Sequence, residues 1–255
     1  MRQIAWGASL ALSCLLLSSC FDEATPPPDP TPTASPTPSP TATPAPASFV
    51  FDFGTDGEAW TAGFADYADE QADLIDFDFG VRQLPAPLEA ESGYLLAGTN
   101  RSDDLTTFAW RKVENLVPGQ SYSVAIELTI ASDVPTGCFG VGGSPGDSVY
   151  VKAGATGAEP SVAKDDAGSY RVSVDQGQQA QGGTEATVLG TIGADGAGSC
   201  DAGVYAVKTF SPPEDLPVVK ADAAGSAWLW LSTDSAFESR TAIYLLDATF
   251  SLTPS

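Results

Sequence analysis

Alternation of apolar and polar residues, with a period of two, is the main pattern along the chain after residue 48. The clearest runs are residues 122–130 and 244–252, where every second residue is apolar and its neighbours are mostly polar. Because the side chains of a strand point alternately to its two faces, this spacing predicts strands with one buried face. Shorter strand candidates are residues 49–53, 93–96, 105–112, 148–152, 170–174, 186–192, 205–208 and 227–231.

Clusters of glycine, proline, asparagine and aspartate separate the predicted strands and are typical of turns. No segment carries a long apolar stripe with the 3.6-residue period of a helix. About ten short strands within residues 49–255 are enough for two packed sheets. The pattern therefore predicts an all-β domain, a two-sheet antiparallel β-sandwich.

A proline-rich segment precedes this predicted domain. Residues 25–48 read TPPPDPTPTASPTPSPTATPAPAS and contain ten of the twenty prolines of the chain. Proline fixes φ and has no N–H donor, so the segment favours an extended polyproline II conformation over a helix or a sheet. We expect a disordered linker that acts as a spacer. A proline-rich ligand for a recognition domain is the alternative.

The start of the chain has the pattern of an export signal. Residues 4–17 are mostly apolar, but this run is shorter than the roughly 20 residues of a membrane-spanning helix. The residues LSSC at positions 17–20 resemble the lipobox of bacterial lipoproteins. The resemblance implies cleavage before Cys20 and its modification with a diacylglycerol and an N-acyl chain such as palmitate, which would anchor the protein to a lipid bilayer. An ordinary signal peptide that is cleaved elsewhere is the alternative.

The lipobox resemblance divides the chain into a signal peptide at residues 1–19, a lipidated cysteine with its linker at residues 20–48, and the β-sandwich domain at residues 49–255. It also places the protein in the bacterial cell envelope. In enteric bacteria an aspartate directly after the lipidated cysteine signals retention in the inner membrane, and here that position is Phe21. We therefore expect the outer membrane or the cell surface rather than the inner membrane.

The cysteines of the predicted domain are consistent with export. Cys138 and Cys200 are the two cysteines that follow the linker. Exported compartments are oxidising, so we expect a disulfide between them. Two buried free thiols are the alternative.

The chain is strongly acidic and contains no histidine. Its formal net charge is −22, from 33 Asp and Glu against 11 Lys and Arg. This charge would repel phosphate, which excludes nucleic acid as a partner and disfavours strongly anionic polysaccharides. The absence of histidine excludes Ser-His-Asp and Cys-His catalysis and the usual catalytic zinc sites. An enzyme of this composition would depend on carboxylates, lysine, tyrosine or a hard metal ion.

Three short segments of the predicted domain carry recognisable motifs. Residues 51–53 read FDF and are followed by Trp60, residues 116–124 read LVPGQSYSV, and residues 243–250 read IYLLDATF. These segments resemble the opening strand, the entry to a central strand and the closing strand of galactose-binding-like jelly rolls. That fold includes many carbohydrate-binding modules, so the resemblance implies a jelly-roll sandwich that binds a glycan.

The same resemblance implies a candidate calcium site. In many such modules a structural Ca²⁺ joins the first and last strands, and Asp52 and Asp247 are the matching positions in this chain. Because Ca²⁺ takes six to eight oxygen ligands, the two aspartates would need further ligands. Two solvated strand carboxylates are the alternative. We expect no required cofactor, with a structural calcium as the one candidate.

Four polar blocks interrupt the apolar pattern, at residues 100–104, 140–154, 175–179 and 233–238. If loops at one end of the sandwich converge, these blocks would form a charged cleft, and a structural ion-pair network is the alternative. The candidate ligand-binding residues are Arg101, Asp103, Asp104, Lys152, Asp175, Gln178, Asp234 and Glu238. The aromatic residues that would either stack on sugar rings or pack in the core are Trp60, Phe64, Tyr67, Trp110, Trp228 and Trp230.

These observations favour a membrane-anchored exported lipoprotein whose sandwich binds a glycan or another component of the envelope without catalysing a reaction. The partners would then be the lipid bilayer, through acylated Cys20, and a glycan or envelope ligand. Two alternatives stay open. One is a glycoside-active enzyme that uses paired carboxylates, and the other is a structural or assembly lipoprotein without a small ligand.

Overall fold

The computed structural model describes residues 44–255. The predicted signal peptide, Cys20 and most of the predicted linker lie outside the described residues. The first strand begins at Ala47, so the last two residues assigned to the linker belong to the folded domain. No helix within the described residues is long and apolar enough to cross a membrane.

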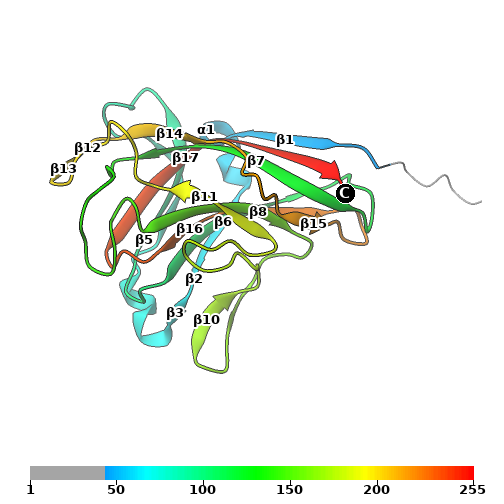
Figure 1. Cartoon of the computed structure of the whole chain (residues 1–255), viewed down its shortest axis with the longest axis horizontal. Helices are drawn as coiled ribbons and strands as arrows, with labels where there is room; N and C mark the ends of the chain where they lie inside the picture. The colour runs from blue at the N-terminus through cyan, green and yellow to red at the C-terminus, as the bar shows by residue number, and fades with distance from the viewer. Residues whose placement is uncertain (1–43) are drawn as a thin grey trace, which may run out of the picture. The chain divides into compact units, whose positions relative to one another are not determined.

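Seven strands form the larger of the two main antiparallel sheets (Figure 1). They are β1 (Ala47–Asp52), β4 (Asp78–Gln83), β5 (Ser92–Thr99), β7 (Ser121–Ser132), β14 (Ala206–Phe210), β15 (Val218–Lys220) and β17 (Arg240–Pro254). Five of them follow the order β14-β7-β17-β5-β4, while β1 pairs with β17 and β15 pairs with β7. The first and last strands of the described chain are therefore neighbours in this sheet.

Five strands form the second antiparallel sheet, in the order β11-β8-β16-β6-β2. They are β2 (Thr61–Ala65), β6 (Leu105–Val113), β8 (Val149–Thr156), β11 (Ala186–Thr191) and β16 (Ala227–Ser235). The smaller elements are β3 (Tyr67–Ala68), β9 (Val162–Lys164), β10 (Ser169–Val172), β12 (Gly198–Ser199), β13 (Ala202–Gly203), the helix α1 (Phe53–Asp56) and the 3-10 helices η1 (Gly57–Ala59) and η2 (Asp69–Leu74). Strands β3, β10 and β9 form a separate three-stranded sheet, and β12 and β13 form a hairpin.

The apolar faces of the two large sheets pack against each other and form the core. Strand β7 contributes Val124, Ile126 and Leu128, and β16 contributes Leu229 and Leu231. Each of these side chains is at most 1% exposed. Full burial of such a side chain stabilises a fold by about 1.5–3 kcal/mol. The predicted all-β domain, an antiparallel two-sheet sandwich of the jelly-roll class, is confirmed.

The LVPGQSYSV segment enters β7 through a turn at Gly119. The φ of Gly119 is 71°, a conformation that favours glycine. The Gly119 N–H donates to the carbonyl of Ala221 at 3.2 Å, and the Tyr122 hydroxyl accepts from the N–H of Val117 at 3.0 Å. These contacts set the residue at which β7 begins. They therefore also set the register that directs its apolar residues into the core.

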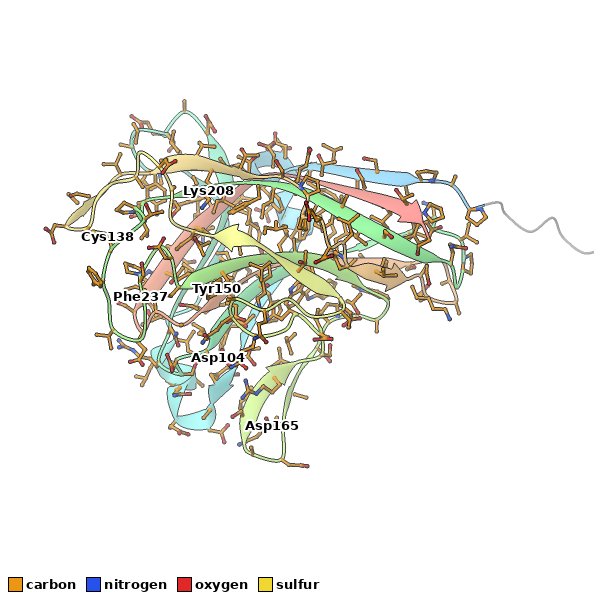
Figure 2. All side chains as sticks on the ribbon, viewed as in Figure 1. Asp104, Cys138, Tyr150, Asp165, Lys208 and Phe237 are labelled. Carbon is orange, nitrogen blue, oxygen red and sulfur yellow. A yellow bond between two sulfur atoms is a disulfide. The ribbon has the colours of Figure 1, made fainter. Side chains whose placement is uncertain are left out.

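A disulfide joins Cys138 and Cys200, as the sequence predicts, with the two Cα atoms 5.6 Å apart. Cys138 lies in the loop between β7 and β8, and Cys200 lies between β12 and β13. Figure 2 shows Cys138 at the end of the domain that carries the β12–β13 hairpin. The loop and the hairpin are thus covalently tied, although 62 positions separate the two cysteines.

Strand β16 is buried on both of its faces, since all nine of its residues are buried. Leu229 and Leu231 face the core, so the alternating residues Trp230, Ser232 and Asp234 project from the outer face of the second sheet. The segment between β10 and β11 covers this outer face. The candidate site lies between this segment and the second sheet.

Candidate functional site

One buried lysine holds the segment between β10 and β11 against the second sheet. The ammonium of Lys152 donates to the backbone carbonyls of Gln176 at 3.0 Å and Gln181 at 3.1 Å. It also lies 2.8 Å from Oδ2 of Asp234. The Lys152 side chain is completely buried and that of Asp234 is 3% exposed. Because three acceptors surround the ammonium, Lys152 fixes both the segment and the Asp234 carboxylate.

The side chain of Gln176 anchors the same segment. Its Nε2 donates to the hydroxyl of Thr106 at 2.8 Å, and its Oε1 accepts from the hydroxyl of Ser232 at 2.7 Å. The indole N–H of Trp230 donates to Gln176 Oε1 at 3.3 Å and to Ser232 Oγ at 3.1 Å, so the Ser232 hydroxyl accepts from Trp230 while it donates to Gln176. Buried polar groups that all have partners define one position for the segment.

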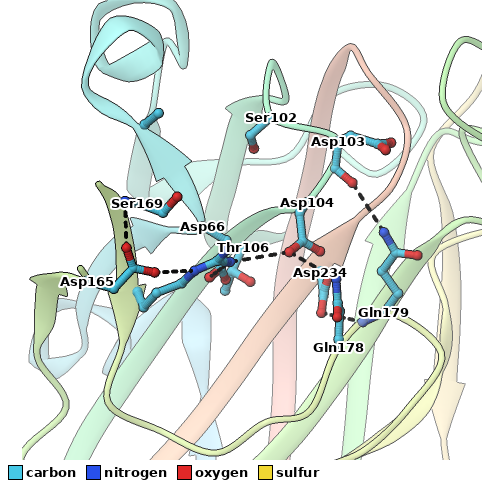
Figure 3. Close-up of polar contacts among 12 residues, drawn as sticks. Asp66, Ser102, Asp103, Asp104, Thr106, Asp165, Ser169, Gln178, Gln179 and Asp234 are labelled. Atoms are coloured by element: carbon cyan, nitrogen blue, oxygen red, sulfur yellow. Dashed lines mark hydrogen bonds and ion pairs between the residues drawn. The ribbon is translucent and has the colours of Figure 1, made fainter. Parts of the chain in front are cut away.

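A pocket of about 270 Å³ opens between this segment, β10 and the residue that follows β2. The polar side chains that line it are the carboxyls of Asp66, Asp104, Asp175 and Asp234, the guanidinium of Arg171 and the amides of Gln176 and Gln178. Figure 3 shows Asp66, Asp104 and Asp234 gathered in one place, although they come from distant parts of the chain. We call this hollow the acidic pocket.

Arg171, on β10, is the cation of the acidic pocket. Its Nη1 lies 2.8 Å from Oδ1 of Asp66 and 3.5 Å from Oδ2 of Asp104, and its Nε lies 3.4 Å from Oδ2 of Asp165. Asp66 follows β2 directly, has a φ of 65°, and donates its N–H to the carbonyl of Tyr170 at 2.7 Å. The turn after β2 thus brings the Asp66 carboxylate to Arg171.

Burial changes the protonation of two carboxyls in the acidic pocket. The pKa of Asp104 is raised to about 6. Burial away from water is the largest cause, the negative charges of Asp234 and Asp66 add to it, and the positive charge of Arg171 lowers the pKa in part. Burial also raises the pKa of Asp234, against the effect of Lys152. Oδ1 of Asp104 and Oδ1 of Asp234 are buried and have no hydrogen-bond partner within residues 44–255. The pocket therefore contains two acceptors that the described protein groups leave unpaired.

The structure brings half of the eight predicted ligand-binding residues together. Asp104, Asp175, Gln178 and Asp234 line the acidic pocket. Asp175 differs from Asp104 and Asp234 because both of its carboxylate oxygens have partners. Oδ2 accepts from the backbone N–H of Thr184 at 3.0 Å and from its hydroxyl at 2.7 Å, and Oδ1 accepts from the N–H of Gly177 at 3.3 Å.

The other four predicted residues do not line this pocket. Lys152 lies beneath it with no exposed surface, so it positions Asp234 and the covering segment instead of contacting a ligand. Arg101, Asp103 and Glu238 are exposed and lie outside the lining of the pocket. The carbonyl of Asp103 accepts from the side-chain amide of Gln179 at 3.2 Å, which ties the two neighbouring loops together.

Asp66, Arg171 and Gln176 line the pocket but are not among the predicted ligand-binding residues. Asp66 lies between the short strands β2 and β3, which show no clear alternation, and Arg171 lies in the predicted strand at residues 170–174, outside the polar blocks. Gln176 does belong to a predicted polar block, residues 175–179. Its place in the same polar block as Gln178 is therefore a sequence signal that could identify Gln176 as a pocket residue.

An aromatic groove of about 380 Å³ lies on the other side of the β9–β10 hairpin. Phe64, Tyr67, Phe77 and Trp110 line it, and the Phe64 ring centre is 4.9 Å from that of Tyr67 and 5.1 Å from that of Phe77. Val162 of β9 lines the groove, while Arg171 and Val172 of β10 line the acidic pocket. The two hollows therefore share one hairpin as a wall.

The aromatic candidates divide between the groove and the interior. Phe64, Tyr67 and Trp110 line the groove and are partly exposed. Trp60, Trp228 and Trp230 are buried, with exposed fractions of 9% or less. Trp230 stacks on Phe108 beneath the groove, with ring centres 4.6 Å apart, so it supports the site without contacting a ligand.

Asp52 and Asp247 lie directly opposite each other on β1 and β17 and line a third hollow together with Glu91. Burial, followed by the charges of Asp52 and Glu91, raises the pKa of Asp247. Within residues 44–255 no group of three or more carboxylate, cysteine or histidine side chains is close enough to hold a metal ion. Asp52 and Asp247 alone do not supply the oxygen ligands that Ca²⁺ needs, and structural calcium stays a prediction.

Comparison with known proteins finds no matching family model and no similar curated protein. Among solved structures, the chain is similar to a carbohydrate-binding module of the β-sandwich superfamily, with 13% identity and a TM-score of 0.36 over 76% of this chain and 58% of that one. It is also similar to a carbohydrate-binding module that recognises mannan, with 12% identity and a TM-score of 0.36 over 82% and 98% of the two chains. A third similar structure is the K3 cleaved adhesin domain of Lys-gingipain from Porphyromonas gingivalis, with 11% identity and a TM-score of 0.36 over 81% and 99%. A fold does not specify a function, which depends on the side chains of the site.

Proposed function

We propose that this domain is a non-catalytic glycan-binding module whose site combines the acidic pocket and the aromatic groove. One observation carries the proposal. A pocket whose wall holds two buried carboxylate oxygens without a partner among residues 44–255 lies next to a groove lined by partly exposed aromatic rings, and one hairpin separates them.

The two hollows match the two faces of a sugar. Hydroxyl groups of a sugar can donate to Asp104 and Asp234 and can exchange hydrogen bonds with the amide of Gln178. The apolar face of a sugar ring can pack on Tyr67 or Trp110, since aromatic rings combine a large apolar surface with little side-chain entropy to lose. A glycan of more than one residue would occupy both hollows.

Replacing Tyr67 by alanine is expected to weaken glycan binding about 2–10-fold, because one stacking surface of the groove is lost. Tyr67 lies on the two-residue strand β3, outside the sandwich core, so the fold should persist. A glycan array identifies the ligand, and isothermal titration calorimetry then measures its affinity. Phe139→Ala is the matched control, because Phe139 is a fully exposed aromatic that lines neither hollow of the site. Equal affinities of both variants, or no bound glycan on the array, would contradict the proposal.

We also propose that Cys20 is acylated and holds the domain on a membrane, since the residues LSSC at positions 17–20 resemble a lipobox. Cys20→Ser is expected to abolish incorporation of a clickable palmitate analogue and to move the protein from the membrane fraction to the soluble one. Cys14→Ser is the control, because Cys14 lies in the segment that cleavage would remove. Membrane association that survives in Cys20→Ser would refute the anchor.

A glycoside-cleaving enzyme is the second candidate, because Asp104, with its pKa raised to about 6, lies in one pocket with Asp234. A protonated carboxyl beside a second carboxyl can support general-acid cleavage of a glycosidic bond. We nevertheless expect no release of reducing ends from the glycan that binds, because Oδ2 of Asp234 is held by Lys152 and by the N–H of Gln179. If the wild type released reducing ends and Asp104→Asn did not, the domain would be an enzyme that cleaves glycans and not a binding module.

A further inference from the structure

The acidic pocket contains hydrogen-bond acceptors without donors. Asp234 is 2% exposed and lines the pocket, and its Oδ1 has no partner within residues 44–255. Oδ1 of Asp104 is also buried and has no hydrogen-bond partner among these residues, while Oδ2 of Asp104 accepts from the side-chain amide of Gln178 at 3.3 Å. A buried carboxylate oxygen without a donor is costly, so a ligand that brings donors to this place gains more than it would in water.

The charge of the pocket also favours a cationic group. Four carboxylates line it against one guanidinium. That guanidinium, on Arg171, is already engaged by Asp66, Asp165 and Asp104, at 2.8, 3.4 and 3.5 Å. Lys152, beneath the pocket, neutralises the charge of Asp234. Its three N–H donors are already used by the Asp234 carboxylate and by two backbone carbonyls of the covering segment. Negative charge therefore remains at the open side of the pocket.

A divalent cation is a poorer match for this charge than an organic ammonium group. Within the described part of the chain no three carboxylate, cysteine or histidine side chains are close enough to hold a metal ion. An ammonium group needs fewer ligands, because each of its three N–H bonds requires one acceptor. The volume, about 270 Å³, lies just below the range of roughly 300–1,000 Å³ for drug-sized ligands, so it suits a single sugar residue.

We propose that the acidic pocket selects a sugar with a free, protonated amine, as in a glucosamine unit, and places that ammonium between Asp104 and Asp234. This inference rests on the glycan-binding function proposed above and narrows its ligand class. The carboxyl groups of Asp104 and Asp234 turn so that their buried Oδ1 atoms accept from the ammonium, and the ring or a neighbouring sugar continues toward the aromatic groove. N-acetylation removes the charge and two of the three donors, and a neutral hexose offers only hydroxyl groups.

Calorimetric titration of the full-length protein with three oligosaccharides of equal length tests this inference. These are a glucosamine oligomer, its N-acetylated form and a neutral glucose or mannose oligomer. We expect the glucosamine oligomer to bind at least about tenfold more tightly than the other two, since only its ammonium forms charge-assisted hydrogen bonds with Asp104 and Asp234. Equal or tighter binding of a neutral or acetylated oligomer would overturn the amine preference and leave the glycan-binding function standing. Binding of none of the three would overturn both.

A pair of neighbouring variants locates the ammonium. Asp104→Asn removes one charge from the pocket but keeps an oxygen for Gln178 and Arg171, so we expect it to fold and to lose about tenfold in glucosamine affinity. Asp103→Asn is the matched control, because Asp103 is exposed and does not line the pocket. Equal loss in both variants, or no loss in Asp104→Asn, would overturn the assignment of the amine to this pocket.

Discussion

An Asp234→Asn variant is expected to lose about 3–5 kcal/mol of its free energy of unfolding, because the Lys152 ammonium would then be a buried charge without a counter-ion. Both side chains are almost completely inaccessible to water, and their charged atoms are 2.8 Å apart. The N–H of Gln179 also donates to Oδ2 of Asp234 at 2.7 Å, so the change weakens the covering segment as well. Urea unfolding followed by tryptophan fluorescence measures the loss, since Trp230 lies beside this segment.

Two further variants make this result specific. Glu114→Gln removes one partner of the exposed Lys112–Glu114 pair, at 2.8 Å, and should leave the free energy of unfolding nearly unchanged. A Lys152→Met/Asp234→Leu double variant removes both buried charges and should recover part of the loss. Recovery stays incomplete because the carbonyls of Gln176 and Gln181 lose their donor. If Asp234→Asn were no less stable than Glu114→Gln, the structural role of the buried pair would be wrong.

Removal of the Cys138–Cys200 disulfide is the second large effect, with an expected loss of about 4 kcal/mol. The bridge closes a loop across 62 positions, and a closed loop of that length restricts the unfolded chain strongly. Urea unfolding of a Cys138→Ser/Cys200→Ser variant measures the loss. Wild-type protein under reducing conditions should unfold at the same urea concentration as the variant. An unchanged midpoint in both samples would contradict the expectation.

The two effects act on different parts of the domain. The disulfide ties the β7–β8 loop to the β12–β13 hairpin, at a distance from the residues that line the acidic pocket. Lys152 and Asp234 hold the segment that forms one wall of that pocket. We therefore expect disulfide loss to lower stability with little change in glycan affinity, whereas loss of Asp234 lowers both.

Alternation predicted the strands that have one face in the core and one in solvent or a polar layer. Strand β7 is the clearest example, because its buried residues alternate with more exposed ones over most of its length. Strand β2, with the sequence TAGFA, was not predicted. Its glycine and alanines carry no apolar period, and it is a strand because it pairs with β6 at the edge of the second sheet.

The sequence by itself determined the fold class, the disulfide partners and four of the pocket residues, Asp104, Asp175, Gln178 and Asp234. These follow from local properties: the spacing of apolar residues, the number of cysteines and the polar blocks between strands. Only the tertiary structure decided that Lys152 is buried beneath the acidic pocket and that Asp66 and Arg171 line that pocket. It also decided that Tyr67 lines the aromatic groove while Trp230 packs beneath the groove. Those roles depend on which loop covers which face of a sheet, and such contacts between distant segments leave no periodic trace in a single chain.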